Sequence, residues 1–308
     1  MHRSVSPTEP RFPHVRQDFK TLRTSLRFVL FSVTLLVCTA LATADTVDIS
    51  FSSYVNWEDA EVVVTGRAAL EGDYSGETAR AARQILRRRD EAFRNAVVGV
   101  PVSSAETVRD ILDERPGLIG ELDEREPAGV ASGARPTRDL RFADLTIRYP
   151  LHETITRAYR PHEIPRAVPR SLSWVPTREY TGVVIDARGQ LPVHGTEEES
   201  KVEPVVLPRL YDSGMRLLLE SRMVEPEYLS RWGTAAYTSD PALEGLEDRI
   251  GDDPLFTAAD SVFGTRPANP MLPREAAERL LTLSENRRLL AEGRVVIVVE
   301  PEVLETDR

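Results

Sequence analysis

A cluster of prolines divides the chain and limits what its middle can fold into. Pro161, Pro165, Pro169 and Pro176 fall within sixteen residues. Each proline fixes its φ angle and lacks a backbone N–H, so a segment this dense in proline cannot form a helix interior or a central strand. We therefore predict that residues 160–179 form an extended linker. The chain of 308 residues is long enough for a separate domain on each side of it.

The residues before the linker follow two kinds of periodicity. Apolar side chains recur at every second position in 46–55 and again in 62–70, which predicts two half-buried strands. In residues 75–97 the apolar positions instead share one helical face. Ser103 and Glu106 have the spacing of a capping box and predict a second helix that begins there. The remaining predicted segments of this half are a mobile loop at 117–138 and a strand at 145–149.

The residues after the linker alternate short strands with helices. Val295–Val299 is a run of β-branched residues, which is the pattern of a central strand covered on both faces. Asp212-Ser213-Gly214 predicts a hairpin of 205–211 with 215–220. The other predicted elements are strands at 181–186, 233–238 and 255–259 and helices at 243–250 and 276–290. The fold class is therefore predicted to be α+β, with two small mixed α/β domains, 45–159 and 180–308, joined by the Pro-rich linker 160–179.

The first 44 residues have the composition of a secretory signal peptide. Six basic residues and only two acidic ones precede an uncharged apolar segment, Phe28–Ala44, which ends in the small-x-small cleavage site Ala42-Thr43-Ala44. We predict that residues 1–44 are a signal peptide and that the mature protein is periplasmic or secreted. One alternative is an uncleaved anchor, for which seventeen residues is short. The other is lipidation at Cys38, which Val37 disfavours because a lipoprotein signal has a small residue there.

The composition excludes several classes of protein. A formal charge of -10 argues against a general nucleic-acid-binding surface. Hydrophobic residues at 41% and charged residues at 29% argue against a polytopic membrane protein and a disordered chain. Cys38 is the only cysteine, so an intramolecular disulfide and a Cys-rich zinc site are excluded. We expect contact with a membrane only through an uncleaved signal segment.

Motifs that would indicate an enzyme are missing from the sequence. It contains no GxSxG elbow, no GxxxxGK[ST] phosphate loop and no GxGxxG dinucleotide turn. His152-Glu153 and His162-Glu163 resemble paired ligand sites, but neither has the HExxH spacing that places two histidines on one helical face. The acidic runs at 197–199 and 252–253 and the basic run at 87–89 are typical of solvated turns and a solvated helix face. We predict no enzyme, no catalytic residues, no cofactor and no metal site.

Asp186 and Arg188 are the most suggestive polar residues. They follow the predicted strand 181–186 directly, so both side chains are expected near the end of a buried strand. One interpretation is a polar site for a ligand or a reaction. The simpler interpretation is an ion pair that closes the strand end, with Gly189 supplying the turn.

The first half also resembles a known family. The residues that carry this resemblance are Trp57-Glu58, Gly66-Arg67-Ala68, Ala79-Arg80-Ala81-Ala82, Ala92, Asn95 and Ala96. Together they are similar to the first domain of the flagellar assembly protein T (FlgT) family and to small periplasmic lipoproteins related to it. The second half resembles an extension of unknown function in secreted proteins, through the segments 180–189, 207–211 and 293–299. The resemblance implies a structural protein of the envelope or the flagellar base, and it carries over no catalytic residue.

Two functions are therefore open from the sequence. The first is a non-enzymatic envelope or assembly protein whose partners are envelope or flagellar-base proteins. It predicts an edge strand or an apolar patch for partner contact. The second is a periplasmic small-ligand-binding protein or an enzyme with a dispersed site around Asp186 and Arg188. It predicts a deep pocket with converging polar groups.

Overall fold

The structure is a computed structural model that describes residues 48–72, 75–117, 129–156 and 162–307. The predicted signal peptide 1–44 and residues 118–128 of the predicted loop lie outside them. Residues 48–308 form one compact unit. Helices occur beside several sheets, so the α+β prediction is confirmed, while the division into two domains at 160–179 stays a prediction. Among the described residues, no helix has both the length and the apolar character that a membrane crossing requires.

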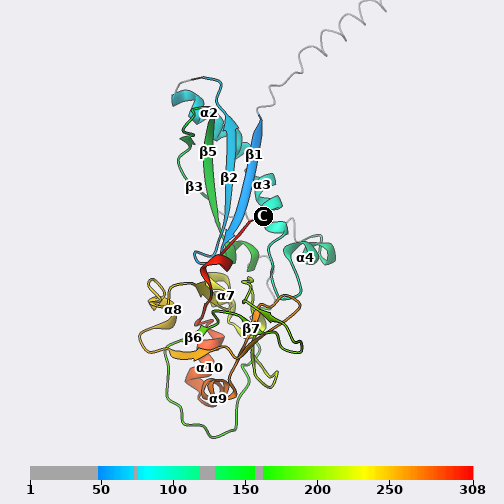
Figure 1. Ribbon diagram of the computed structural model, residues 1–308, viewed down its shortest axis with the longest axis vertical. Coiled ribbons are helices and arrows are strands. Elements are labelled where there is room, and N and C mark those ends of the chain that lie inside the picture. The colour runs from blue at the N-terminus through cyan, green and yellow to red at the C-terminus, as the bar shows by residue number, and fades with distance from the viewer. Residues whose placement is uncertain (1–47, 73–74, 118–128, 157–161, 308) are drawn as a thin grey trace, which may run out of the picture. The chain divides into compact units, whose positions relative to one another are not determined.

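The first part of the unit is an antiparallel sheet with helices packed against it (Figure 1). Its strands in spatial order are β16 (Glu305–Asp307), β1 (Ile49–Asn56), β2 (Glu61–Ala69), β5 (Phe142–Pro150) and β3 (Val130–Ala131), and β4 (Arg135–Pro136) also pairs with β5. Side chains at alternate positions of β5 are buried, as expected of a strand with one face on the core. Gly66 in β2 lets the first helix approach closely, because a Cβ atom there would lie 2.3 Å from Ile85.

The structure of this part corrects three predictions, two about helices and one about a loop. The predicted helix 75–97 breaks at Arg88, where the backbone turns to ψ 6°, and forms α2 (Ser75–Arg87) and α3 (Arg89–Val98). The next helix, α4 (Val108–Glu114), does not begin at Ser103. Its capping box is formed by Thr107 and Asp110 instead. The predicted loop 117–138 is also partly wrong, because it contains the short strands β3 and β4.

The second part contains a fully parallel sheet. Its spatial order is β11 (Ala236–Thr238), β15 (Val295–Val298), β6 (Val183–Asp186) and β12 (Leu255–Ala258). All four residues of β15 are buried, which confirms the prediction of a central strand. A second sheet has the order β10 (Leu217–Leu219), β9 (Leu210–Asp212), β14 (Asn269–Leu272) and β13 (Ser261–Phe263). The remaining short strands, β7 (Leu191–Pro192) and β8 (Glu199–Ser200), pair with each other.

The helices of the second part are short. They are α7 (Pro226–Trp232), α8 (Glu247–Ile250), α9 (Arg274–Thr282) and α10 (Ser284–Ala291), with the single turns η1 (His152–Thr156), η2 (Ser221–Met223) and η3 (Pro301–Val303). The predicted helix 276–290 is wrong as one element, because Leu283 adopts extended backbone (ψ 144°) and separates α9 from α10. The predicted hairpin around 212–214 is confirmed, but only β9 and β10 form strands there.

The proline-rich segment contains no helix or strand in its described part, residues 162–179, as its prolines predict. It runs along α9 and α10 (Figure 1) and is bonded to them. The Ser171 N–H donates to the Leu281 carbonyl (3.2 Å), and the Ser171 hydroxyl donates to the Glu278 carboxylate. The Asn286 amide donates to the Arg178 carbonyl (2.9 Å). We call residues 162–179 the strap.

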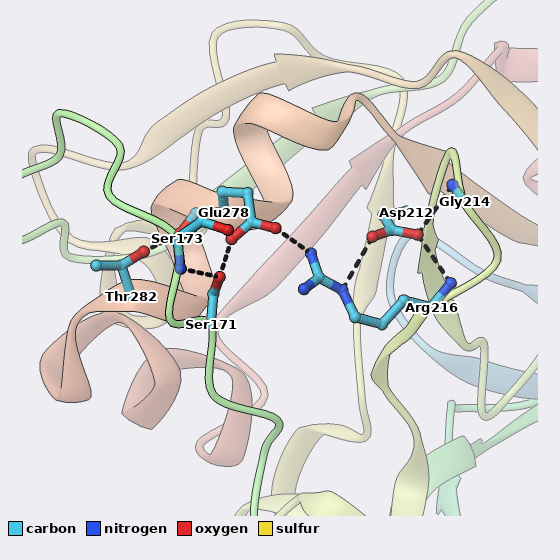
Figure 2. A network of polar contacts seen from close by, with 7 residues as sticks. All are labelled: Ser171, Ser173, Asp212, Gly214, Arg216, Glu278 and Thr282. Carbon is cyan, nitrogen blue, oxygen red and sulfur yellow. Dashed lines mark hydrogen bonds and ion pairs between the residues drawn. The ribbon is translucent and has the colours of Figure 1, made fainter.

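A polar network joins the strap to the second sheet. Figure 2 shows the Arg216 guanidinium between two buried carboxylates, with its Nε 2.9 Å from Asp212 Oδ2 and its Nη2 2.8 Å from Glu278 Oε1. Asp212 also accepts hydrogen bonds from the backbone N–H groups of Gly214 and Arg216, and these bonds fix the β9–β10 turn. These bonds hold three segments that are distant in the chain, so we assign the network a structural role.

Candidate functional site

The predicted pair Asp186–Arg188 is an exposed ion pair closed on itself. Arg188 donates from Nε to Asp186 Oδ1 (2.9 Å) and from Nη2 to Oδ2 (2.7 Å). The Asp186 side chain is 46% exposed and the Arg188 side chain is 43% exposed. The hydrogen bond from Arg188 lowers the pKa of the Asp186 carboxyl. Gly189 has φ +83° and supplies the turn, as predicted. Neither residue of the pair lines the cavity described below.

The three histidines that follow the predicted signal peptide lie in different environments. His162 Nε2 lies 2.8 Å from the Val224 carbonyl, and His194 is exposed beside Phe263. The sequence favours exposed loop histidines over metal ligands at His152 and His162, and this is wrong for His152, which is buried. Among the described residues, no group of three or more His, Cys, Asp or Glu side chains is placed to hold a metal ion.

His152 is part of the lining of a cavity of about 310 Å³. Its walls are formed by the β1–β2 turn, the junction of β5 with η1, the C-terminal end of α7, β11 and α8, together with Val205 from a loop. The lining includes Trp57, His152, Trp232, Tyr237, Leu246 and Arg249. The cavity therefore collects side chains that are up to 192 positions apart in the sequence.

The aromatic walls are held by hydrogen bonds at their polar ends. Trp57 lies in the β1–β2 turn, where its N–H donates to the Leu304 carbonyl (2.9 Å) and its indole donates to Thr306 (3.2 Å). Its ring meets Tyr237 edge-on at 6.1 Å. The Tyr237 hydroxyl bonds to the backbone of Val205, and burial raises the pKa of this phenol. The Trp and Tyr polar groups are thus used by the protein itself, and their rings supply apolar wall.

Arg249 is a buried cation in this wall. Its side chain is held by carbonyl oxygens, with Nε 2.9 Å from Gly293 O and Nη1 2.9 Å from Trp232 O. The guanidinium carbon also lies 5.3 Å from the centre of the Trp232 ring. No carboxylate of the described residues lies within ion-pairing distance of it. Burial without a counter-charge lowers its pKa to about 9, so the group remains a cation at neutral pH.

His152 lies at the start of η1, a single π-helical turn, a feature that often marks functional sites. Its ring lies against Gly233, where a Cβ atom would be only 2.4 Å from the imidazole. The ring Nδ1 is buried and has no hydrogen-bond partner in the described structure. Burial, and secondarily the charge of Arg249, lower the pKa of His152 to about 3, so the imidazole is neutral near pH 7.

The opening of the cavity is more acidic than its interior. Glu58, Asp59 and Asp248 are exposed lining residues, and Arg231 is the exposed cation among them. Glu58 is fixed by bonds from the Thr238 hydroxyl (2.9 Å) and the Ser239 N–H (3.2 Å). The cavity therefore has an apolar aromatic body, a cation and a neutral imidazole inside, and carboxylates outside.

The sequence contains little signal for this site. Arg249 stands in the charged run Glu247-Asp248-Arg249, which is typical of a solvated helix face. Trp57 takes part only in the family motif Trp57-Glu58, and His152 only in the pair His152-Glu153. The signal available in the sequence was Trp57 itself, because a large aromatic side chain in a turn is normally buried against a segment that is distant in the chain.

In the comparison with known protein families, the matching region lies in the second part of the chain. Residues 182–301 match the family described as Treponema pallidum Tp0624, second domain. The match contains Trp232, Tyr237 and Arg249 but not Trp57 or His152. No curated protein is similar enough to the chain to match it. The matched region therefore supplies the cation of the cavity, and residues outside it supply the imidazole.

Proposed function

We propose that this protein binds a small organic molecule in the cavity between the β1–β2 turn, α7, β11 and α8. The observation that carries the proposal is the pair of buried polar side chains, Arg249 and His152, which retain unused hydrogen-bonding capacity inside an aromatic-walled space. Ligand sites are typically apolar concavities with a few converging polar groups. At about 310 Å³, the cavity is near the small end of the range for such sites.

The proposal is binding without chemical conversion. Sixteen residues line the cavity, and none of these described residues is Ser, Thr, Cys or Lys. These four residue types are common nucleophiles in covalent catalysis, and the carboxylates of the lining, Glu58, Asp59 and Asp248, lie at its exposed opening. The Tyr237 hydroxyl is committed to the backbone of Val205. We further propose that the protein works in the periplasm or outside the cell, which the signal-peptide pattern of residues 1–44 supports.

Tryptophan fluorescence provides a direct test. The chain has three tryptophans, of which Trp57 and Trp232 line the cavity and Trp174 is 89% exposed on the strap. Trp174→Phe therefore leaves a protein whose remaining tryptophans both report on the cavity. We expect members of a panel of small acids, amides, amines and sugars to change its fluorescence and raise its melting temperature.

A cavity-filling variant supplies the control for this test. Ala236→Leu places three extra carbons in the lining, and Ala258→Leu makes the same change at an exposed position of β12, the opposite edge of the same sheet. We expect the first variant to lose the fluorescence response and the second to keep it, with both remaining folded by thermal melt. If no member of the panel changes fluorescence or melting temperature, the proposed function is wrong.

A second function, assembly with an envelope or flagellar-base protein, is favoured by the strap. Ile164, Leu172 and Trp174 are 83%, 87% and 89% exposed, although the strap backbone is bonded to α9 and α10. Exposed apolar groups of this size on a held segment are typical of contact surfaces. The FlgT-like motifs of the first half support a partner in the flagellar base.

Affinity capture tests the assembly function. The double variant Leu172→Ser/Trp174→Ser should retain the melting temperature and lose partners retained from an envelope fraction. Phe256→Ser is the matched control, because Phe256 is another exposed apolar side chain (63%) that belongs to β12 and not to the strap. Equal capture by all three proteins would contradict a contact through the strap.

A further inference from the structure

The unused donors of Arg249 indicate what the cavity recognises. A guanidinium carries five N–H donors. Arg249 uses one each for the carbonyls of Gly293 and Trp232, both at 2.9 Å, and makes a long contact of 3.5 Å to Gly233. Two N–H groups have no acceptor among the described residues. Carbonyl oxygens solvate the cation but do not neutralise it, so the buried positive charge lacks a counter-charge.

His152 adds a second donor beside this cation. It is 8% exposed, and its buried ring Nδ1 has no hydrogen-bond partner among the residues that the structure describes. A neutral imidazole carries one N–H donor and one acceptor nitrogen. A buried polar group without a partner is costly, and each such group in a native protein calls for an explanation. An anionic ligand would accept hydrogen bonds from both the guanidinium and the imidazole. It would thereby balance the buried charge of Arg249 and give His152 a hydrogen-bond partner.

The charges around the opening restrict the kind of anion. One buried cation balances one negative charge. The exposed Glu58, Asp59 and Asp248, together with a chain charge of -10, repel ligands with several negative charges, such as phosphate esters. A carboxylate matches the planar fork of a guanidinium and is singly charged.

We propose that the cavity recognises a small monocarboxylic acid, with its carboxylate bound by Arg249 and His152 and its apolar part against Trp57 and Tyr237. This inference rests on the proposed ligand-binding function and names the ligand class for the same site. The mouth carboxylates exclude polyanions, and the aromatic walls select an organic acid over an inorganic anion.

Matched pairs of acids and amides test the inference in the Trp174→Phe protein. The probes are propionate and propionamide, cyclohexanecarboxylate and cyclohexanecarboxamide, and 3-phenylpropionate and 3-phenylpropionamide, each pair nearly equal in shape. We expect the acid of at least one pair to bind ten times or more tightly than its amide. Arg249→Met should abolish this preference. Arg222→Met should retain it, because Arg222 is an exposed arginine of η2 that does not line the cavity.

A second measurement covers the case in which Arg249→Met does not fold. The ring signals of His152 in the NMR spectrum are identified by their loss in His152→Leu. A bound carboxylate should raise the pKa of His152, because a nearby negative charge favours the imidazolium, and the amide should not. Equal affinity for acids and amides, or unchanged His152 signals on acid binding, would overturn the inference and leave ligand binding standing. If no acid and no amide binds, both the inference and the proposed function fail.

Discussion

His152 should make the stability of this fold depend on pH between the ordinary pKa of a carboxyl group and that of an imidazole. The imidazole is buried, and its pKa is lowered from 6.5 to about 3 by burial and by Arg249. The folded protein therefore excludes a proton that the unfolded chain accepts. The stability from a neutral His152 is fully present above pH 6.5, the ordinary value, and is lost as the pH falls toward about 3.

The size of the effect follows from the two pKa values. At pH 5 the unfolded imidazole is almost fully protonated while the folded one remains neutral. This difference corresponds to a loss of about 2 kcal/mol relative to pH 7.5. Carboxyl groups with lowered pKa values, such as Asp186 and Asp110, titrate below their ordinary value of 3.8 and contribute little in this interval.

Urea unfolding of the intact chain at pH 7.5 and pH 5 measures the effect. We expect the free energy of unfolding to fall by about 2 kcal/mol in the wild type and by much less in His152→Leu. His194→Leu is the matched control, because His194 is exposed, and it should behave like the wild type. The reasoning is refuted if His152→Leu loses as much stability between the two pH values as the wild type does.

Three further predictions concern the other polar contacts and the strap. Asp186→Ala, Arg188→Ala and their double variant should all melt close to the wild type, because the pair is about half exposed; a large drop in any thermal melt would contradict this. Arg216→Met should lower the free energy of unfolding, measured in urea, by about 2–3 kcal/mol, because it leaves two buried carboxylates without their cation. The loss is limited because the arginine is 35% exposed and its charge is partly screened by solvent. An unchanged urea midpoint would refute the structural role of the network. Trypsin should cut within 166–178, and the two fragments should still co-elute in gel filtration, because β16 pairs with β1 across the cut; separate elution would mean that the halves are independent.

Local sequence patterns predicted most strands and helices, because their causes are local. Val295–Val299 is buried on both faces because β-branched side chains fill a covered strand, and the strap is extended because its prolines allow nothing else. The errors occur where distant contacts decide the backbone. Leu283 separates α9 from α10 although the apolar positions continue across it, and residues 130–136 form strands only because β5 is there to pair with them.

The cavity could not be predicted, because its parts are unremarkable one by one. Arg249 stands in a charged run that favours solvent, and His152 follows the end of a strand. Their importance comes from Gly233, which admits the imidazole, and from the carbonyls of α7 and Gly293, which hold the guanidinium. The widest of those contacts, between His152 and Gly233, joins residues 81 positions apart, and no single-sequence pattern encodes it.

A last prediction separates a ligand site from a packing feature. A buried imidazole without a hydrogen bond costs about 1–3 kcal/mol, a cost that a leucine of similar volume avoids. If His152 is retained for ligand recognition, His152→Leu should unfold at a higher urea concentration than the wild type at pH 7.5, and it should also lose affinity for the acids of the probe pairs. Gained stability with lost binding is the trade-off expected where a functional residue breaks a packing rule. His152→Leu with a lower urea midpoint would instead show that the imidazole is a satisfied structural group, and the argument from its missing partner would be wrong.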